Sequence, residues 1–165
     1  MIWKVAVGFV AALLLMASPA QAGDLNVTVI GIRSEAGAVM MGVYDSPERF
    51  TTAVNNAAHV GLLSDKGRLI GVTLRARRID QGIGFLKLPP GRYAIIVFHD
   101  ENDNGLLDKN VLGIPTEGYG FSNNARGFFS APSFDAAAVT VGNGDTNISI
   151  ALTYQTAPPP RRFAK

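Results

Sequence analysis

The stretch PPGRYAIIVFH, residues 89–99, decides the fold class of this chain. A Pro-Pro-Gly turn leads into a strand that is apolar at nearly every position. Because side chains alternate between the two faces of a strand, each face here carries its own apolar set. A strand that is apolar on both faces is typical of the centre of a sheet that is covered on both sides. One set is Tyr93, Ile95 and Val97, which share a face with His99. The other set is Ala94, Ile96 and Phe98.

Shorter apolar or β-branched runs occur on both sides of this strand, and Gly, Pro and Asn turns separate them. Runs of this kind predict strands. About seven strands at this spacing predict an all-β fold, an antiparallel β-sandwich of two sheets. The expected strands are Leu25–Ile32, Val39–Tyr44, Leu69–Arg77, Gly84–Leu88, Tyr93–His99, Val139–Val141 and Ile148–Tyr154.

Two segments depart from the strand pattern. Ser46 is a favourable helix N-cap and Pro47 follows it at the first helical position, so we expect one short helix over about Pro47–Val54. The Gly-rich segment Gly113–Gly127 has few strand signals and predicts a long ordered loop. Long loops in compact domains are usually functional or packed by their own side chains.

The two ends of the chain differ from its body. Residues 1–22 have the pattern of a secretory signal peptide, with Lys4, an apolar run Val5–Met16 and an Ala-x-Ala site ending at Ala22. The apolar run is shorter than the roughly 20 residues that span a bilayer, although an uncleaved N-terminal anchor is the alternative. We therefore expect an exported protein, periplasmic or extracellular, with a single domain over 23–156. The Pro-rich basic segment 157–165 predicts a disordered tail.

Composition narrows the classes of partner. The chain has no cysteine, which excludes disulfides and a lipid-modified cysteine. Cleavage after Ala22 removes Lys4 and takes the formal net charge from +2 to +1. No basic stripe with interleaved aromatic residues indicates a nucleic-acid partner. The densest basic run is Arg75-Ala76-Arg77-Arg78, which we interpret as a solvated face, with phosphate binding as the alternative.

A calcium-loop pattern follows the central strand directly. In HDENDNGLLD, residues 99–108, oxygen-bearing side chains alternate after Asp100, and Gly105 stands where such loops bend sharply. Glu101 and Asp103 are expected to point outward. The predicted metal ligands are Asp100, Asn102, Asn104, the Leu106 carbonyl and Asp108.

The predicted calcium site is poor in charge. Val111 stands where a helix–loop–helix calcium hand carries a bidentate glutamate, so Glu117 is our candidate for a further carboxylate ligand. Extracellular sites of this type bind calcium at about 10⁻⁴–10⁻³ M. Magnesium is disfavoured by its strict geometry, and zinc because His59 and His99 are the only nitrogen ligands and cysteine is absent. The alternative is a metal-free turn held by its own Asx hydrogen bonds.

Three motifs carry a family resemblance. Leu88–Ala94, the acidic loop and GIPTEGYGFSNNA, residues 113–125, resemble the exported bacterial family catalogued as domain of unknown function 2141, over about Asp24–Tyr154. This resemblance implies no established activity. The strand after the Pro-Pro-Gly turn is also similar, in architecture alone, to transthyretin-like, immunoglobulin-like and collagen-adhesin B-type sandwich domains.

The predicted long loop is also the candidate ligand-binding surface. Tyr119 and Phe121 form an aromatic platform for a sugar or peptide, beside Asn123 and Asn124. The alternative is that both aromatic rings pack under the loop as a small satellite core.

A catalytic interpretation has little support from the residues. Ser122, His99 and Asp100 lack the setting of a nucleophile, and we expect His99 to be a hydrogen-bonded structural residue. We expect an exported non-catalytic module with a structural Ca²⁺ that binds a protein or glycan partner in the cell envelope. The alternative is a small exported hydrolase acting on a glycan or an ester. It would need a pocket that holds Glu117, His99 and a carboxylate of the acidic loop.

Overall fold

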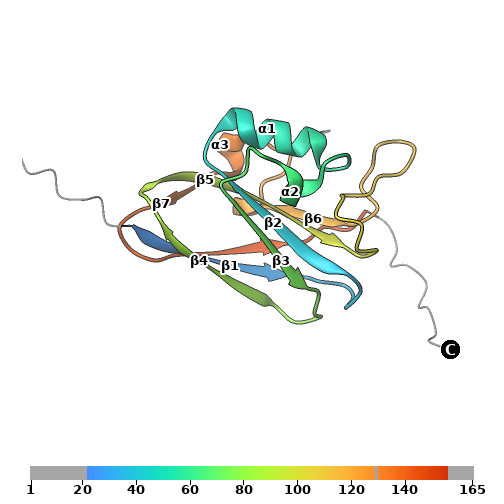
Figure 1. Ribbon diagram of the computed structural model, residues 1–165, viewed down its shortest axis with the longest axis horizontal. Coiled ribbons are helices and arrows are strands. Elements are labelled where there is room, and N and C mark those ends of the chain that lie inside the picture. The colour runs from blue at the N-terminus through green and yellow to red at the C-terminus, as the bar shows by residue number, and fades with distance from the viewer. Residues whose placement is uncertain (1–21, 129, 156–165) are drawn as a thin grey trace, which may run out of the picture.

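The structure is a computed structural model that describes residues 22–128 and 130–155, with the backbone alone at 84–87. These ranges contain eight strands in two sheets and few helices, which confirms the predicted all-β sandwich (Figure 1). The predicted signal peptide, except its last residue, and the predicted tail 157–165 lie outside the described residues.

The first sheet has the strand order β4-β1-β8. Strand β1 (Gly23–Ile30) pairs antiparallel with β4 (Gln81–Leu88) but parallel with β8 (Thr146–Ala151), where Val27 lies opposite Ile148. The predicted antiparallel pairing therefore holds for β1 with β4 and is wrong for β1 with β8. A tight hairpin can join only antiparallel strands. The chain passes through the second sheet between β1 and β8, and this long connection allows the two strands to run parallel.

The second sheet has the order β3-β2-β5-β6, with β7 paired to the beginning of β5. Its central strands are β2 and β5, which run antiparallel with Met41 opposite Val97. The strands span Ala38–Tyr44 (β2), Ile70–Arg75 (β3), Gly91–Asp100 (β5), Gly118–Phe121 (β6) and Val139–Val141 (β7).

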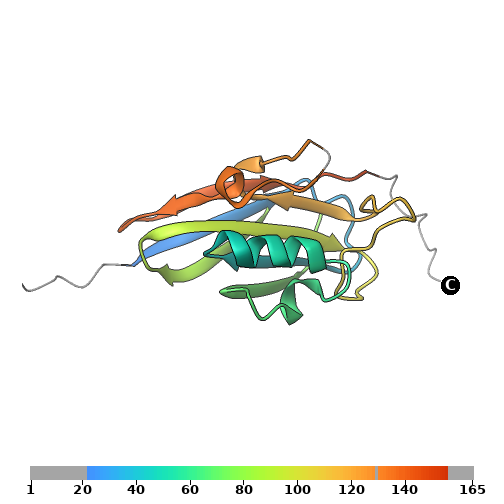
Figure 2. The ribbon, with the colours of Figure 1, turned by 90° about the horizontal axis from the view of Figure 1, so that it is seen from above.

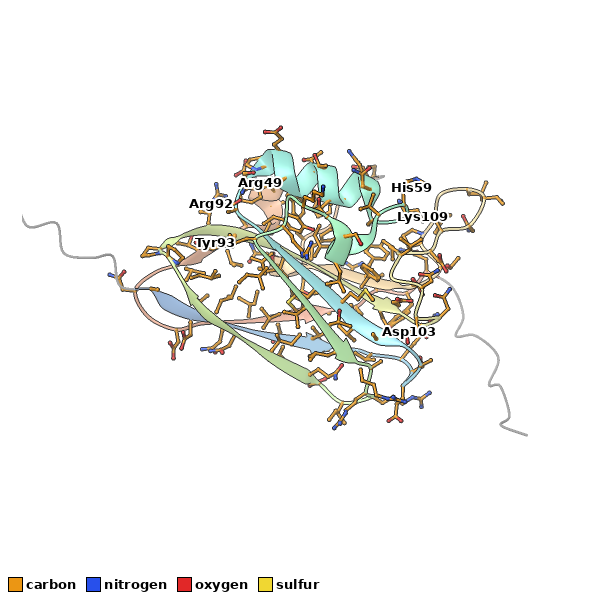
Figure 3. All side chains as sticks on the ribbon, in the orientation of Figure 1. Arg49, His59, Arg92, Tyr93, Asp103 and Lys109 are labelled. Carbon is orange, nitrogen blue, oxygen red and sulfur yellow. The ribbon has the colours of Figure 1, made fainter. Side chains whose placement is uncertain are left out.

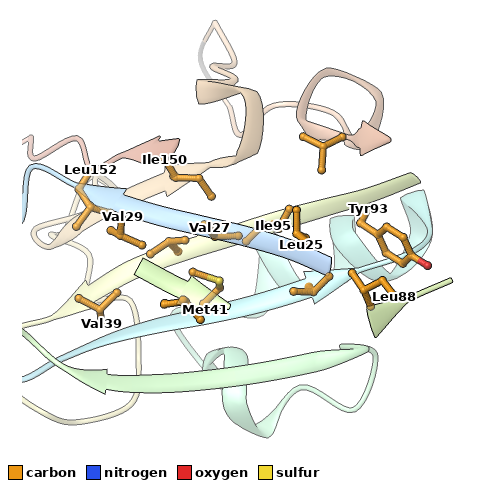
Figure 4. Close-up of a cluster of buried hydrophobic side chains, with 14 of the residues drawn as sticks. Leu25, Val27, Val29, Val39, Met41, Leu88, Tyr93, Ile95, Ile150 and Leu152 are labelled. Carbon is orange, nitrogen blue, oxygen red and sulfur yellow. The ribbon is translucent and has the colours of Figure 1, made fainter. Parts of the chain in front are cut away.

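Two hydrophobic cores lie on the two faces of this second sheet. Between the sheets, Val27 of β1 packs with Met41 of β2 and Ile95 of β5 (Figure 4). On the outer face, Ile96 and Phe98 of β5 pack against the helices. The prediction that β5 is covered on both sides is thus confirmed, because its two apolar sets enter two different cores.

The helices form a third layer over the second sheet (Figure 2). Helix α1 (Pro47–Asn56) begins as predicted, with the Ser46 Oγ accepting a hydrogen bond from the Arg49 N–H at 3.4 Å. Three short turns were not predicted: α2 (Gly61–Ser64), the 3₁₀ turn η1 (Ser122–Asn124) and α3 (Phe134–Ala137). In the described ranges, none of these helices is long and apolar enough to cross a membrane.

Strand β6 corrects the prediction that Gly113–Gly127 is a continuous loop. Its glycines allow close approach and do not mark turns. A Cβ on Gly118 would lie 2.3 Å from the ring of Tyr154, and one on Gly120 would lie 2.7 Å from the Ala151 carbonyl oxygen. The glycines therefore let β6 lie against the end of β8. Pairing with β5 holds this segment in the strand conformation, which its glycines disfavour locally.

Candidate functional site

The acidic loop 100–108 begins where β5 ends, and its first carboxylate is turned inward. Asp100 is buried, and its two carboxylate oxygens accept hydrogen bonds from the backbone N–H groups of Asn104 (3.1 Å) and Gly105 (2.7 Å). Asp103 and Gly105 have positive φ angles of 64° and 80°, which produce the sharp bends of the loop. The loop lies at one end of the sandwich, where Asp103 is labelled in Figure 3.

The other predicted ligands also gather in this loop. Asn102 Oδ1 accepts from the N–H of Asn104 at 3.1 Å, and Asn104 Oδ1 accepts from the N–H of Leu106 at 2.8 Å. The Asp108 carboxylate accepts from the side-chain amides of Asn102 (2.6 Å) and Asn104 (3.1 Å). The bonds from the Asn104 and Leu106 N–H groups are Asx turns, as the metal-free alternative expects. Among the described residues, no three His, Cys, Asp or Glu side chains are grouped as a metal site.

Glu117 reaches the loop but binds its backbone. Its carboxylate is buried, and it accepts hydrogen bonds from the N–H groups of Glu101 (2.8 Å) and Asp108 (3.1 Å). Glu117 therefore ties together the beginning and the end of the acidic loop. Burial raises the pKa of Glu117 to about 7, with the nearby Asp100 and Asp108 adding to the rise and the two hydrogen bonds opposing it.

Glu101 does not point into solvent, contrary to the expectation from its loop position. Its carboxylate forms an ion pair with the Arg33 guanidinium and accepts a hydrogen bond from the Ser34 hydroxyl at 2.8 Å. Burial alone would raise the pKa of Glu101, yet the hydrogen bonds from Arg33 and Ser34 hold it below its usual value. The loop is thus fastened to the β1–β2 connection by a partly buried ion pair.

His99 is structural, as the sequence predicted. It is fully buried, with Nε2 2.8 Å from the Ala36 carbonyl oxygen and Nδ1 2.8 Å from the Tyr154 hydroxyl. A carbonyl oxygen can only accept, so Nε2 carries the proton and Nδ1 accepts from Tyr154. Burial lowers the pKa of His99, which keeps the ring neutral. Both ring nitrogens of His99 are therefore engaged in hydrogen bonds within the domain.

The aromatic residues of β6 alternate with its glycines. Phe121 is buried and packs in the core beneath the helices, with its ring centroid 6.0 Å from that of Phe50. Tyr119 is half-buried, and its hydroxyl accepts a hydrogen bond from Gln155 Nε2 at 3.3 Å. The packed alternative therefore describes Phe121, and Tyr119 keeps part of its surface accessible.

The Ser-Asn-Asn sequence after β6 joins three elements. The Ser122 hydroxyl accepts from the Ile95 N–H of β5 at 2.9 Å and donates to the Ala137 carbonyl at the end of α3. Asn123 Nδ2 donates to the Ala138 carbonyl at 2.9 Å. Asn124 Oδ1 accepts from the Ala151 N–H of β8 at 2.8 Å, as a neighbouring strand would. These contacts give Asn123 and Asn124 structural roles, and ligand binding by them stays a prediction.

A pocket of about 750 Å³ opens beside β6. Tyr119 and Phe121 contribute to its lining, together with the segments 112–115 and 124–128 and two residues that follow β8, Thr153 and Gln155. A volume of this size is typical of ligand-binding sites. Neither Glu117 nor His99 is among the described residues that line it.

Comparison with known proteins places the chain in a family. A model of the family described as "uncharacterized protein conserved in bacteria (DUF2141)" matches residues 27–149. The chain belongs to the DUF2141 family. No match was found among curated proteins or among solved structures. The matched range of this DUF2141 domain runs from β1 into β8 and includes the motifs that carry the resemblance, so the predicted membership is confirmed.

Two residues of the buried network were missed by sequence reasoning. Arg33 follows β1 and Tyr154 lies near the end of the described DUF2141 domain, yet the Arg33 guanidinium carbon is 4.3 Å from the centre of the Tyr154 ring. The Arg33 N–H also donates to the Tyr154 hydroxyl at 3.2 Å. Neither residue belongs to a motif, so no local signal could have paired them.

Proposed function

We propose that this domain is an exported, non-catalytic binding module that holds an apolar, acidic segment of a partner protein in the pocket beside β6. The observation that carries the proposal is the set of exposed apolar side chains on the pocket rim. Leu112, Ile114 and Phe128 line the pocket, and Leu112 and Phe128 are 77% and 88% exposed. Clustered exposure of large apolar side chains on a folded surface is typical of interaction sites.

The rim is presented by an ordered turn. The Asn110 side-chain oxygen accepts hydrogen bonds from the N–H groups of Leu112 (2.9 Å) and Ile114 (3.0 Å). The Asn110 N–H donates to the Ile114 carbonyl oxygen at 2.9 Å, which closes the turn. A turn fixed in this way loses little conformational freedom on binding, so its apolar side chains are suited to hold a partner.

Charge favours an acidic partner. The charged residues among the described lining of the pocket are Lys109 and Arg126, and no carboxylate is among them. Figure 3 labels Lys109 near the end of the sandwich that carries the acidic loop. Two of the three exposed rim residues, Leu112 and Ile114, are aliphatic, which favours a protein segment over a glycan, because glycan sites rely on aromatic faces and polar groups.

The hydrolase alternative has no comparable support. A hydrolytic centre would need its acid and base in the pocket, but Glu117 and His99 lie outside the described lining. Both carboxylate oxygens of Glu117 and both ring nitrogens of His99 are engaged in hydrogen bonds.

Photo-cross-linking tests the binding proposal. A photoreactive residue at Leu112 should give one dominant protein adduct in bacterial cells, and the same residue at Leu69 should not. Leu69 is also exposed, at 45%, but lies outside the pocket. With the purified partner, Leu112→Ser should weaken binding by roughly tenfold, about 1.4 kcal/mol, and Leu69→Ser by much less. Equal adducts from both positions, or binding of glycan fragments and no acidic peptide, would contradict the proposal.

We further propose that the acidic loop binds calcium weakly through Asp100, Asn102, Asn104 and Asp108. In support, the side-chain amides of Asn102 and Asn104 both donate hydrogen bonds to the Asp108 carboxylate, so three of the four side chains already lie together. A cation would replace these donors as the amides turn their oxygens inward. Glu117 is left out of this set because it lies outside the loop and its oxygens bond to N–H groups at both ends of it. Asp100 also accepts backbone N–H groups, and it is kept because it is the first position of the loop pattern.

Thermal unfolding with added calcium tests this second proposal. When the free calcium concentration is ten times the dissociation constant, binding to the folded state adds about 1.4 kcal/mol to the free energy of unfolding. This should raise the melting temperature by roughly 3–5 °C. Asp100→Asn should remove most of that rise. The control Asp103→Asn should keep it, because Asp103 is exposed and asparagine tolerates its positive φ. Identical responses of the parent and both variants would show that the loop is only a turn.

A further inference from the structure

The connection between β3 and β4 concentrates exposed positive charge. Arg75, Arg77 and Arg78 are all exposed, and within the described residues none of them has an ion pair. The acidic residues nearest in sequence or pairing are Asp80 of the same connection, Glu35 of the adjacent turn, and the buried Asp100, which lies on the other side of β2 from Arg75. Positive charge therefore dominates only among the exposed side chains of the connection itself.

The connection is anchored beneath its arginines. Ala76 is buried, and its N–H donates to the Gly37 carbonyl oxygen at 3.1 Å. Gln81 Nε2 donates to the Arg75 carbonyl oxygen at 2.9 Å and ties the two strand ends together. The backbone that carries the cations is therefore held in place and does not need to be ordered by a ligand.

An exposed apolar side chain follows the arginines. Ile79 is 64% exposed, and it stands directly after Arg78. The connection joins β3, an edge strand of the second sheet, to β4, an edge strand of the first, so it lies at a corner of the sandwich (Figure 1). A corner position lets these side chains reach a flat surface together.

We propose that the β3–β4 connection docks on an anionic lipid bilayer, with its arginines on lipid phosphates and Ile79 in the acyl boundary. Arginine matches phosphate oxygens through paired N–H donors. Each basic side chain near an anionic leaflet strengthens binding about fivefold. An apolar side chain among cations is the composition of surfaces that lie on membranes. This inference is independent of the partner pocket, because no residue is shared between 75–79 and the described lining of that pocket.

Fluorescence of a single tryptophan tests the docking. Trp3 is the only tryptophan of the sequence, so the chain from Gly23 onwards, which keeps every described strand, has none. Ile79→Trp should give a blue-shifted emission with vesicles of phosphatidylglycerol and phosphatidylcholine, and none with phosphatidylcholine alone. Leu69→Trp, at the opposite end of β3, should show no shift. Free glycerol phosphate should leave the Ile79→Trp emission unchanged, because a soluble phosphate offers no acyl boundary.

Two variants that remove the same charge decide which group of basic residues binds the vesicles. In the Ile79→Trp background, Arg75→Gln, Arg77→Gln and Arg78→Gln together should abolish the blue shift and weaken vesicle binding by roughly 100-fold. The control removes the same charge from the C-terminal segment through Arg161→Gln, Arg162→Gln and Lys165→Gln, and should keep the blue shift. An unchanged Ile79→Trp emission on anionic vesicles, or loss of the shift in the control alone, overturns the proposal.

Discussion

At the scale of single residues, Glu117 holds the acidic loop in its observed shape. Its carboxylate bonds to the N–H groups of Glu101 and Asp108 while it is buried between the charges of Asp100 and Asp108. The protein tolerates this burial because the loop backbone would otherwise have two unpaired N–H groups. The same arrangement predicts how stability depends on pH.

The parent protein should lose stability as the pH rises from about 4.5 to 7, and the Glu117→Gln variant should not. In the parent, the native carboxyl holds its proton up to a pKa of about 7, whereas the unfolded chain releases it near 4.5. The native state therefore binds more protons in this window, and its stability falls by roughly 3 kcal/mol as pH rises. Urea unfolding of both proteins at several pH values, with a chelator present, measures the difference.

His99 changes stability in the opposite direction but is common to both proteins. Its lowered pKa adds stability as pH rises toward 6.5, and this contribution cancels in the comparison. Stability profiles that stay parallel for the parent and Glu117→Gln from pH 5 to pH 8 would show that Glu117 is ionised in the native state at all these pH values.

At the scale of elements, β6 is the strand whose glycines are required by close packing. Gly120→Ala should destabilise the protein by about 1–3 kcal/mol, as overpacking does, because the added Cβ would meet the Ala151 carbonyl oxygen of β8 at 2.7 Å. Backbone atoms cannot move away as a flexible side chain can. Denaturant unfolding of the variant measures the loss.

Gly82→Ala in β4 is the matched control for this substitution. A Cβ on Gly82 would meet nothing within 4 Å, and its φ is not in the left-handed region. Its substitution should leave stability unchanged or raise it slightly by restricting the unfolded chain. Equal losses at Gly82 and Gly120 would contradict the close approach of β6 to β8.

At the scale of the whole molecule, the second sheet makes the two cores interdependent. Ile95 faces the core between the sheets and Ile96 faces the core under the helices, on consecutive positions of β5. Ile95→Ala and Ile96→Ala should each cost about 2–5 kcal/mol and leave a single unfolding transition, because neither core persists without β5. Separate transitions by near- and far-ultraviolet circular dichroism in Ile96→Ala would show that the helix layer unfolds on its own.

The local pattern of the sequence was sufficient for the elements with strong periodicity or caps. The two apolar faces of β5 follow from a run that is apolar at nearly every position, and α1 begins at Pro47 because Ser46 caps it. Both are properties of neighbouring residues, which is why no tertiary information was needed to predict them. The family membership is likewise carried by contiguous motifs.

Tertiary structure alone decided the identity of β6, the Arg33–Glu101 ion pair and the position of the pocket. Strand β6 has only four residues, too few to show a hydrophobic period in the sequence, and its strand conformation is held by pairing with β5. Glu117 bonds to backbone N–H groups, which every non-proline residue carries, so no residue pattern reveals its partners. The sequence by itself therefore determined the strands with clear apolar patterns and which polar side chains the acidic loop carries, and long-range packing determined β6 and where those side chains point.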